Sequence, residues 1–238
     1  MKSDWHCVVD AGNSRIKVGW FLGGELKETE TLEHSQWSAY LPKHRAQKAL
    51  VASVSLPETD LANPLQKGGM TEVRIWHADD PLPFESDYTS PQTLGSDRKM
   101  MVMGANRLHP GINRLVIGMG TCITYDLIDA HGRHRGGDIS PGLHMRWKAM
   151  HRFTARLPEV GVPETWPVLG TDTHRALQAG VLQGVLAEMQ GRKKQLELIL
   201  SDLTIILSGG DAHFFEKRFD NRIFAEPNLA LYGLHALL

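Results

Sequence analysis

Apolar and polar positions alternate over the N-terminal part of the chain, and this alternation predicts a three-stranded meander. Residues 5–10 form the first predicted strand, residues 15–22 its hairpin partner and residues 25–33 a more polar third strand, since the alternation restarts after a Gly-Gly turn. The short apolar run at 49–54 is typical of a buried parallel strand. The chain is therefore expected to begin with a mixed β-sheet.

The same pattern returns in the second half of the chain. Cys7-Val8-Val9 leads into a glycine turn at 10–14, and Leu115-Val116-Ile117 leads into a glycine turn at 118–122. When Gly12 is aligned with Gly120, the Gly23-Gly24 turn falls on His131-Gly132. This repetition indicates one supersecondary unit used twice. We therefore predict two domains, residues 1–111 and 112–238, each large enough for its own core.

Apolar residues at helical spacing and capping residues predict the remaining elements. The predicted helices are a short one from Ser35 to Leu41, a stretch bounded by Pro57 and Gly69, then 97–108, 143–157, a long one capped at 171–173 and ending near Gln190, one after Asp211, and a closing helix before Leu238. Further strands are expected at 203–207 and near 223, and loops at 79–96 and 136–142.

Composition limits the class of partner. The 26 Lys and Arg residues balance 27 Asp and Glu residues, so no global field favours nucleic acid or an acidic membrane. The N-terminal residues 1–6 contain no apolar leader, and no apolar run approaches the roughly 18 to 20 residues that cross a bilayer. Cys7 and Cys122 are expected to be buried free thiols. These features predict a cytoplasmic protein that acts on a small molecule.

The two glycine turns carry the first candidate chemistry. A strand, a tight turn and a returning strand bring several backbone N–H groups together, which suits phosphate oxygens. Asp10 is a candidate for Mg²⁺ through water, and the Lys17 ammonium could reach phosphate. Asp126, on the second returning strand, could also face the metal, or it could be an exposed strand residue. In the structural alternative, Asp10 and Asn13 only satisfy turn amides.

A second cluster, Gly95-Ser96-Asp97-Arg98, lies at a predicted helix start. The Asp97 carboxylate could accept a hydroxyl proton while the Arg98 guanidinium holds an anionic group of the same substrate. As an isolated tetrapeptide it could equally be a helix cap with a surface ion pair. Further along, Ser208-Gly209-Gly210-Asp211 follows a buried strand, at a point where backbone must approach something closely.

In this order the motifs carry a resemblance. The sequence resembles type III pantothenate kinase, a family of the acetate and sugar kinase, Hsc70 and actin superfamily. The resemblance runs from Val9 to Leu234 and rests on seven pieces in the family's order: residues 10–17, Tyr88 with 95–98, 120–126, 136–142, Thr173, 208–210 and 231–234.

The resemblance implies a fold and an activity. The fold would be α/β, with two RNase H-like (actin-like ATPase) domains, each a mixed central sheet flanked by helices, and the active site in the cleft between them. The activity would be ATP-dependent phosphorylation of pantothenate to phosphopantothenate, the first step of coenzyme A biosynthesis. The family is a homodimer whose active sites are shared between subunits, so pantothenate, ATP and a second copy of the chain are the expected partners.

The resemblance also implies roles for individual residues. Asp97 would be the catalytic proton acceptor, and Thr173 would reach pantothenate from the neighbouring subunit. The expected ATP and phosphate residues are Asp10, Gly12, Asn13, Ser14, Lys17, Gly120, Thr121, Gly209 and Gly210. The expected pantothenate residues are Tyr88, Gly95, Ser96, Asp97, Arg98 and Thr173.

One position departs from the family. Where the family usually has an Asp that binds a monovalent cation such as K⁺ or NH₄⁺, this chain has Gly118, followed by Met119. Ser208 stands in place of the more usual Thr, a milder change that keeps the hydroxyl. Dependence on a monovalent cation therefore stays open: the site could be lost, filled by another ligand or replaced by a fixed positive side chain. Two other functions stay open at this point: a kinase of the same superfamily with another hydroxylated substrate, and a catalytically silent nucleotide-binding regulator.

Overall fold

The computed structural model describes residues 5–77, 79–219 and 223–238. Residues 1–4, on which part of the expectation of no leader rests, lie outside these ranges. The chain divides into two compact units. The first unit contains residues up to Gly111, together with 130–136 and 228–238, and the second contains 112–129 and 137–227.

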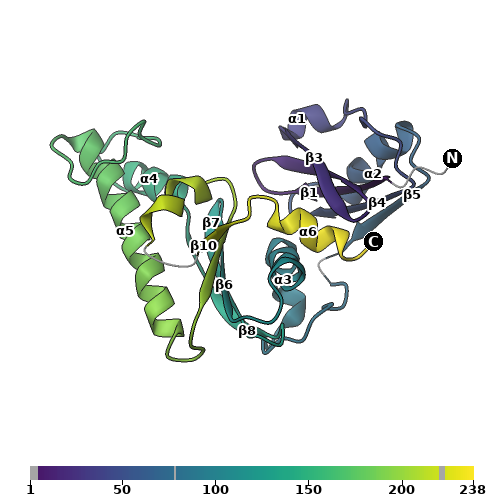
Figure 1. Cartoon of the computed structure of the whole chain (residues 1–238). Helices are drawn as coiled ribbons and strands as arrows, with labels where there is room; N and C mark the ends of the chain where they lie inside the picture. The colour runs from purple at the N-terminus through teal and green to yellow at the C-terminus, as the bar shows by residue number, and fades with distance from the viewer. Residues whose placement is uncertain (1–4, 78, 220–222) are drawn as a thin grey trace. The chain divides into compact units, whose positions relative to one another are not determined.

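The first unit is built on a five-stranded mixed sheet with the order β3-β2-β1-β4-β5 (Figure 1). Strands β1 (Trp5–Ala11), β2 (Ile16–Leu22) and β3 (Glu25–Leu32) form the predicted antiparallel meander. Strands β4 (Lys48–Ser53) and β5 (Glu72–Trp76) run parallel to β1. The parallel strand expected at 49–54 is therefore confirmed, whereas β5 was not predicted.

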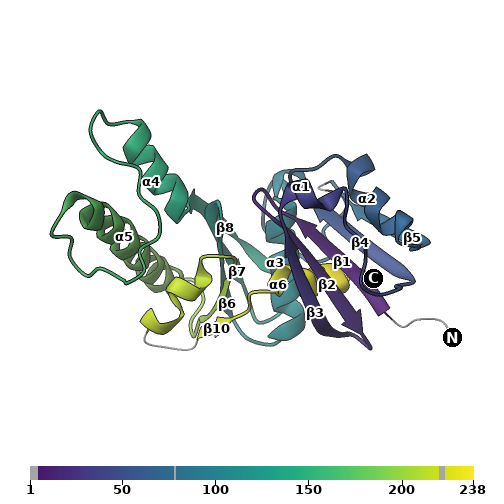
Figure 2. The same cartoon turned by 90° about the horizontal axis from the view of Figure 1, so that it is seen from above.

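Helices cover both faces of this sheet, as Figure 2 shows. Because strand residues point alternately to opposite faces, Cys7 and Val9 pack with Trp37 of α1 (His34–Trp37) and with α2 (Glu58–Lys67). Val8 packs on the opposite face with α3 (Ser96–Leu108) and α6 (Leu229–His235). Asp10 shares the face of Val8 by this alternation, so it lies on the side of the sheet that α3 covers.

Two glycines allow α3 and α6 to pack backbone against backbone. A Cβ at Gly104 would lie 2.1 Å from the Leu229 carbonyl oxygen, and a Cβ at Gly233 would lie 1.9 Å from that of Met100. The closing helix therefore groups with the first unit. This placement differs from the predicted extent of the second domain, 112–238, because a contact between distant segments determines it. The division into domains at 111/112 stays a prediction.

The second unit repeats the strand order of the first. Its sheet has the order β10-β9-β6-β7-β8. β6 (Arg114–Met119) and β7 (Cys122–Ile128) are antiparallel, and β9 (Thr204–Ser208) and β10 (Ile223–Ala225) continue the sheet in parallel. Like β1, β6 is thus the central strand between an antiparallel neighbour and a parallel one. The predicted fold, with two mixed sheets flanked by helices, is confirmed.

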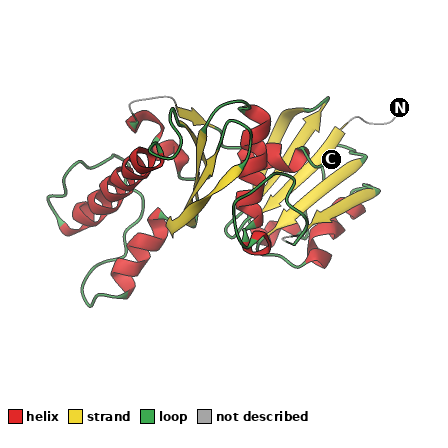
Figure 3. Cartoon of the chain, turned by 90° about the horizontal axis from the view of Figure 1, so that it is seen from below, coloured by secondary structure: helices red, strands yellow, loops and turns green. Residues whose placement is uncertain are grey.

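Two helices dominate the α-structure of the second unit, α4 (Leu143–Arg152) and α5 (Thr173–Leu196). The predicted apolar stripe of α5, Leu177, Val181, Val185 and Met189, is buried in the core. Asp172 caps α5 by accepting a hydrogen bond from the Arg175 N–H at 2.9 Å. The chain between α4 and α5 is loop, drawn green in Figure 3.

Several predicted elements differ in detail. The first helix is capped by Glu33, through a capping box with Gln36, and not by Ser35. The loop predicted at 136–142 is mostly strand β8 (His134–Pro141), because an edge strand tolerates Gly and Pro. Strand β9 is followed by short 3₁₀ turns and not by an α-helix.

Helix α4 ends at Arg152, earlier than the predicted end at Leu157. Leu143 and Trp147 are its buried residues, whereas Phe153 lies beyond its end and is 85% exposed. Of the two thiols, Cys7 is buried as expected and Cys122 only partly. Within the described ranges, no helix is both long and apolar enough to cross a membrane.

Candidate active site

The first glycine turn joins β1 to β2 in the first unit. Asp10 pairs with Lys17 and Ala11 with Ile16, so the four residues 12–15 form the turn. The Gly12 N–H donates to the Arg15 carbonyl oxygen at 3.0 Å. Asn13 and Ser14 lie exposed at the tip. A backbone bond closes the turn, so the residues at its tip present their groups to a ligand.

Side chains from two neighbouring segments support this turn from behind. The His34 ring donates from Nε2 to the Gly12 carbonyl oxygen at 2.9 Å, and the Ser55 hydroxyl donates to the same oxygen at 2.9 Å. The Val54 N–H donates to the Ala11 carbonyl oxygen at 3.1 Å. Sequence reasoning assigned no role to His34 or Ser55, because their contacts cross long stretches of chain.

Asp10 and Lys17 place opposite charges beside the turn. They are register partners on antiparallel strands and therefore share a face of the sheet. Burial raises the pKa of Asp10 to about 6, the negative charge of Asp97 adds to the rise, and Lys17 opposes it. Burial lowers the pKa of Lys17, and Asp10 opposes that change. The structure thus brings the predicted phosphate residues and the predicted base, Asp97, within electrostatic reach of each other.

Asp97 lies in the first turn of α3, which begins directly after Gly95. Its Oδ1 accepts a hydrogen bond from the Arg98 N–H at 2.8 Å. A Cβ at Gly95 would lie 2.6 Å from this Oδ1, so the glycine leaves room for the carboxylate at the helix start. The helix N-terminus also stabilises the ionised carboxylate. The predicted cluster Gly95-Ser96-Asp97-Arg98 is therefore the start of a helix, and it fixes the position of the Asp97 carboxylate.

Arg98 and Ser96 flank this carboxylate and are almost fully buried, at 3% and 2% exposure. Burial of Arg98 excludes the alternative of a surface ion pair. The Arg98 guanidinium lies 5.5 Å from the centre of the Tyr88 ring, which groups both predicted pantothenate residues. The Ser96 hydroxyl is buried and has no hydrogen-bond partner among the described residues, so it is available to form a hydrogen bond with a ligand.

The second glycine turn, in the second unit, has a different construction. Met119 pairs with Ile123, so only Gly120, Thr121 and Cys122 form the turn, and the Gly120 N–H donates to the Cys122 carbonyl oxygen at 3.0 Å. Gly120 and Thr121 are exposed. This turn therefore offers backbone groups and one hydroxyl, without a charged side chain.

Glycines from elsewhere in the second unit pack against this turn. A Cβ at Gly209, whose φ is +96°, would lie 2.2 Å from the Met119 carbonyl oxygen. A Cβ at Gly142 would lie 2.2 Å from the Gly120 carbonyl oxygen, and the Gly142 N–H donates to Thr121 at 3.1 Å. Both glycines are required by close backbone approach. Gly142 was missed as a supporting residue, although the turn contact explains why a glycine precedes α4.

Gly210 differs from Gly209 because it is exposed and no other group lies within 4 Å of the place for its Cβ. Its neighbour Asp211 donates its N–H to the Met119 carbonyl oxygen at 3.2 Å. Burial raises the pKa of Asp211, while His144 and His213 oppose the rise. The Ser208–Asp211 segment and the Gly120 turn are thus adjacent parts of one surface in the second unit.

The candidate metal residues differ in their surroundings. Asp126 is fully buried on β7, so the alternative of an exposed strand residue is wrong. It pairs with Val116, two positions further from the turn than the pair Gly118 and Thr124. No group of three or more His, Cys, Asp or Glu residues that could hold a metal ion occurs in the described part of the chain. A metal here would therefore need oxygen ligands from a substrate.

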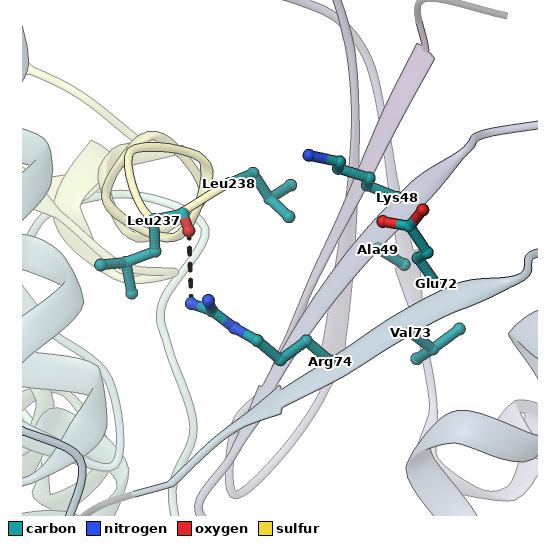
Figure 4. Close-up of a pocket in the computed structure, with 7 residues that line it drawn as sticks. All are labelled: Lys48, Ala49, Glu72, Val73, Arg74, Leu237 and Leu238. Atoms are coloured by element: carbon teal, nitrogen blue, oxygen red, sulfur yellow. Dashed lines mark hydrogen bonds between the residues drawn. The ribbon is translucent and has the colours of Figure 1, made fainter. Parts of the chain in front are cut away.

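Thr173 and a small cavity are the remaining features of the two units. Thr173 is exposed at the start of α5. Figure 4 shows a cavity of about 230 Å³ in the first unit, beside the first residues of β4 and β5. Arg74 there donates to the Leu237 carbonyl oxygen at 3.2 Å. The first turn follows the last residue of β1, at the opposite end of these strands.

Comparisons with known proteins point in one direction. Residues 7–195 match the family model described as type III pantothenate kinase. A type III pantothenate kinase of Phocaeicola vulgatus is 37% identical over 235 residues, which cover 97% of this chain and 96% of the relative. One from Porphyromonas gingivalis is 34% identical over 240 residues, covering 98% of both chains.

Solved structures agree on the fold. A Campylobacter jejuni protein assigned to the Baf family of transcriptional activators superposes with a TM-score of 0.64 at 22% identity, covering 97% of this chain and 96% of that one. An inorganic polyphosphate/ATP-glucomannokinase from an Arthrobacter strain gives a TM-score of 0.50 at 15% identity, covering 99% and 98%. At these identities the likeness concerns the fold alone.

Proposed function

The chain belongs to the type III pantothenate kinase family, and from this premise we propose how its residues phosphorylate pantothenate with ATP. The reaction transfers the γ-phosphoryl group of ATP to the primary hydroxyl of pantothenate. Such a transfer requires of the protein mainly positioning of the reactants and electrostatic stabilisation of the transferred group. The two glycine turns, the start of α3 and the Ser208–Asp211 segment supply these functions.

Each turn, within its own unit, offers groups that suit the phosphates of ATP. Gly12, Asn13 and Ser14 present backbone and side-chain donors from the first turn, and the Lys17 ammonium adds positive charge beside them. Gly120 and Thr121 contribute the second turn. Gly209 and Gly210 lie against the adenosine, where the open space over Gly210 suits a ligand that approaches the backbone.

Asp97 is the proton acceptor. Its carboxylate is held at the start of α3 by the Arg98 N–H, and it interacts electrostatically with Asp10 beside the phosphate turn. As the pantothenate hydroxyl attacks the γ-phosphorus, its proton passes to the Asp97 carboxylate and the bond to ADP breaks. General-base catalysis of this kind contributes roughly 10² to 10⁴ in rate.

Pantothenate carries a carboxylate at the end opposite its primary hydroxyl, and Arg98 is the residue that pairs with an anion. Its guanidinium is buried beside the Tyr88 ring, where water screens an ion pair weakly. Gly95, Ser96 and Tyr88 form the surrounding wall, and the buried Ser96 hydroxyl bonds a polar group of the substrate.

The residues of the first unit fit Mg²⁺. Asp10 offers hard carboxylate oxygens, and the negative charge of Asp97 lies within electrostatic reach of it. Asp10 would hold the ion through water together with the phosphates, with Asp126 as a further candidate. When bound, Mg²⁺ neutralises phosphate oxygens and stabilises the charge of the transferred group.

The residues around Gly118 do not fit a monovalent cation. Gly118 has Thr124 as its partner on β7 and Ser208 on β9, so its neighbours on this face offer hydroxyls and no carboxylate. Asp126 is a diagonal neighbour, about 7 Å away by the geometry of antiparallel strands. We therefore assign no catalytic step to K⁺ or NH₄⁺ and propose that the reaction proceeds without them.

The remaining family features complete the proposal. The protein acts in the cytoplasm as a homodimer, in which exposed Thr173 reaches the pantothenate site of the neighbouring subunit. The observation that carries the proposal is the coupling of Asp97 to Asp10, because it joins the predicted substrate cluster to the predicted phosphate turn in one unit. Balanced charge and the absence of a spanning helix among the described residues agree with a small-molecule substrate.

The test is product formation by the purified protein. Pantothenate, glycerate and glucose are each incubated with MgATP, and phosphorylated products are identified by mass spectrometry. We expect a phosphate ester of pantothenate and neither of the others. Phosphorylation of another hydroxylated compound instead would overturn the substrate, and ATP binding without any product would show a nucleotide-binding regulator.

A further inference from the structure

Two short segments of the first unit, 85–87 and 133–135, pair with each other beside the candidate pantothenate residues. Ser86 and His134 form a parallel β-bridge. The Asp87 N–H donates to the His134 carbonyl oxygen at 2.8 Å, and the His134 N–H donates to that of Glu85 at 2.9 Å. We call residues 85–87 and 133–135 the clamp. Its register places Glu85 opposite Arg133 and Asp87 opposite Arg135.

Opposite charges line one side of the clamp. Arg133 donates to Glu85 at 2.6 Å and, through Nε, to Asp87 at 2.8 Å, while Arg135 Nε lies 2.6 Å from Asp87. Hydrogen bonds from Arg133 first, and then from Arg135, hold the pKa of Asp87 below its usual range. Because side chains alternate along extended chain, these four charges lie on one side and Ser86 and His134 on the other.

The other side of the clamp leads directly to Tyr88. The Ser86 hydroxyl oxygen accepts a hydrogen bond from the Tyr88 N–H at 3.1 Å, and the same oxygen lies 2.8 Å from Nδ1 of fully buried His134. The Ser86 hydroxyl thus bonds both the Tyr88 backbone and the His134 ring. The rings of Phe84 and Tyr88 each lie 6.1 Å from the His134 ring.

The clamp is also attached to the helix that carries Asp97. Asn106, in the last turns of α3, donates from Nδ2 to the Gly132 carbonyl oxygen at 2.9 Å. At the other end of α3, Arg98 lies 5.5 Å from the Tyr88 ring. The loop that holds Tyr88 therefore contacts α3 through both Arg98 and the clamp. These contacts fix the position of the Tyr88 ring relative to the Arg98 guanidinium.

We propose that the clamp positions Tyr88 as a wall of the pantothenate site, with Ser86 and His134 as positioning residues that set substrate affinity. This inference rests on the proposed function. None of the clamp residues lies at the glycine turns or at the start of α3, where ATP and the transferred group bind. Loosening the clamp should therefore weaken pantothenate binding and leave ATP binding and the chemical step unchanged.

The first experiment removes the Ser86 hydroxyl with Ser86→Ala. We expect the KM for pantothenate to rise about tenfold, because the part-buried hydrogen bonds of Ser86 to Tyr88 and His134 are lost, with the KM for ATP and kcat changed less than twofold. Ser90→Ala is the matched control, since Ser90 lies in the same loop and bonds Thr93 only locally. Ser86→Thr keeps the hydroxyl and should restore the KM.

A second measurement tests the hydrogen bonds of the clamp independently of enzyme activity. Hydrogen–deuterium exchange of the peptide covering 84–90 should quicken in Ser86→Ala and not in Ser90→Ala, because the Tyr88 amide loses its acceptor. Faster exchange with an unchanged KM for pantothenate would overturn the inference while leaving the proposed function intact. A wild-type protein that phosphorylates other acids but not pantothenate would overturn the proposed function, and the exchange result would still report on the clamp.

The charged side of the clamp gives an independent test. Asp87→Arg places like charges together and should raise the KM for pantothenate several-fold. The quadruple variant E85R/D87R/R133E/R135E reverses the sign of all four clamp charges, so that opposite charges still face each other. Its KM for pantothenate should therefore return to within about twofold of wild type. A quadruple variant as impaired as Asp87→Arg would show that the ion pairs do not hold the clamp.

Discussion

The two glycine turns share a scaffold and differ in chemistry. In both units the central strand leads into a turn and an antiparallel return, with a parallel strand on the other side. In the first unit the second pair from the turn is Asp10 and Lys17, and in the second unit it is Gly118 and Thr124. A charged pair thus has a neutral counterpart. The difference indicates that the first turn supplies charge and the second supplies backbone donors.

The turns also differ in what supports them. Side chains, His34 and Ser55, hold the first turn through its carbonyl oxygens. Glycines, Gly142 and Gly209, hold the second by allowing backbone to pack on backbone. Substitutions at the first turn should therefore change catalysis more than folding, and substitutions behind the second should change folding first.

The largest effect is expected from Asp10→Asn. Loss of the carboxylate that would hold Mg²⁺ should lower kcat about 100-fold or more, measured as phosphopantothenate formed at saturating substrates. Asp60→Asn is a matched control, since Asp60 is exposed on α2, and it should stay within twofold of wild type. If Asp10→Asn keeps full activity, the two turns do not differ in the way described.

The same variant should gain stability at high pH. The folded pKa of Asp10 is raised to about 6, so the fold favours the protonated acid, and wild-type stability falls as pH rises from about 4 to 6. Asn carries no such cost. In urea unfolding, Asp10→Asn should exceed wild type by about 1 to 3 kcal/mol at pH 8 and match it near pH 4. Equal stabilities at both pH values would contradict the raised pKa.

Next in size is the effect of a methyl group behind the second turn. Gly209→Ala forces a Cβ against the Met119 carbonyl oxygen at a φ of +96°, and it should lower the free energy of unfolding by about 1 to 3 kcal/mol. Gly120→Ala, whose nearest neighbour would be the Cys122 carbonyl oxygen at 3.9 Å, should cost less than about 0.5 kcal/mol. Thermal unfolding of both variants tests the order.

A smaller effect is expected at Lys17. Lys17→Met keeps the length of the side chain and removes the charge beside the phosphates, so the KM for ATP should rise about tenfold with the KM for pantothenate unchanged. Lys27→Met, on the exposed strand β3, should leave both constants unchanged. Similar behaviour of the two variants would remove Lys17 from phosphate binding.

The smallest expected effect is that of monovalent cations. Because Gly118 and its partners offer no carboxylate, replacing K⁺ or NH₄⁺ by Na⁺ at constant ionic strength should change kcat less than twofold. A strict requirement for K⁺ would show that the second turn binds a cation through other oxygens. That result would bring the two turns closer in chemistry.

The repeat was predictable from the sequence because strands and glycine turns are local signals. The clamp, the α3 and α6 contact and the support by His34 were not, because each joins segments far apart in the chain. The lengths of the two turns were not predicted. Residues 12–15 make a four-residue turn and 120–122 a three-residue turn, so Thr124 is the register counterpart of Lys17.

Candidate residues were found where motifs are contiguous. Asp97 and Arg98 adjoin in sequence, so their placement together at a helix start could be predicted. Gly142 gave no chemical signal, because only the packing of the second turn shows why it must be glycine. Strand β8 was mistaken for a loop, since its glycines and proline are tolerated at the edge of a sheet.

The most direct test of the central claim is a single-turnover measurement with Asp97→Asn. Enzyme in excess over radiolabelled ATP is mixed with saturating pantothenate, and the rate of phosphopantothenate formation is compared with wild type after ATP binding has been measured by calorimetry. We predict that Asp97→Asn binds ATP with an affinity within about threefold of wild type. Its rate of phosphoryl transfer should be lower by a factor of roughly 10² to 10⁴. Transfer at the wild-type rate in a folded variant would contradict the assignment of Asp97 as the proton acceptor.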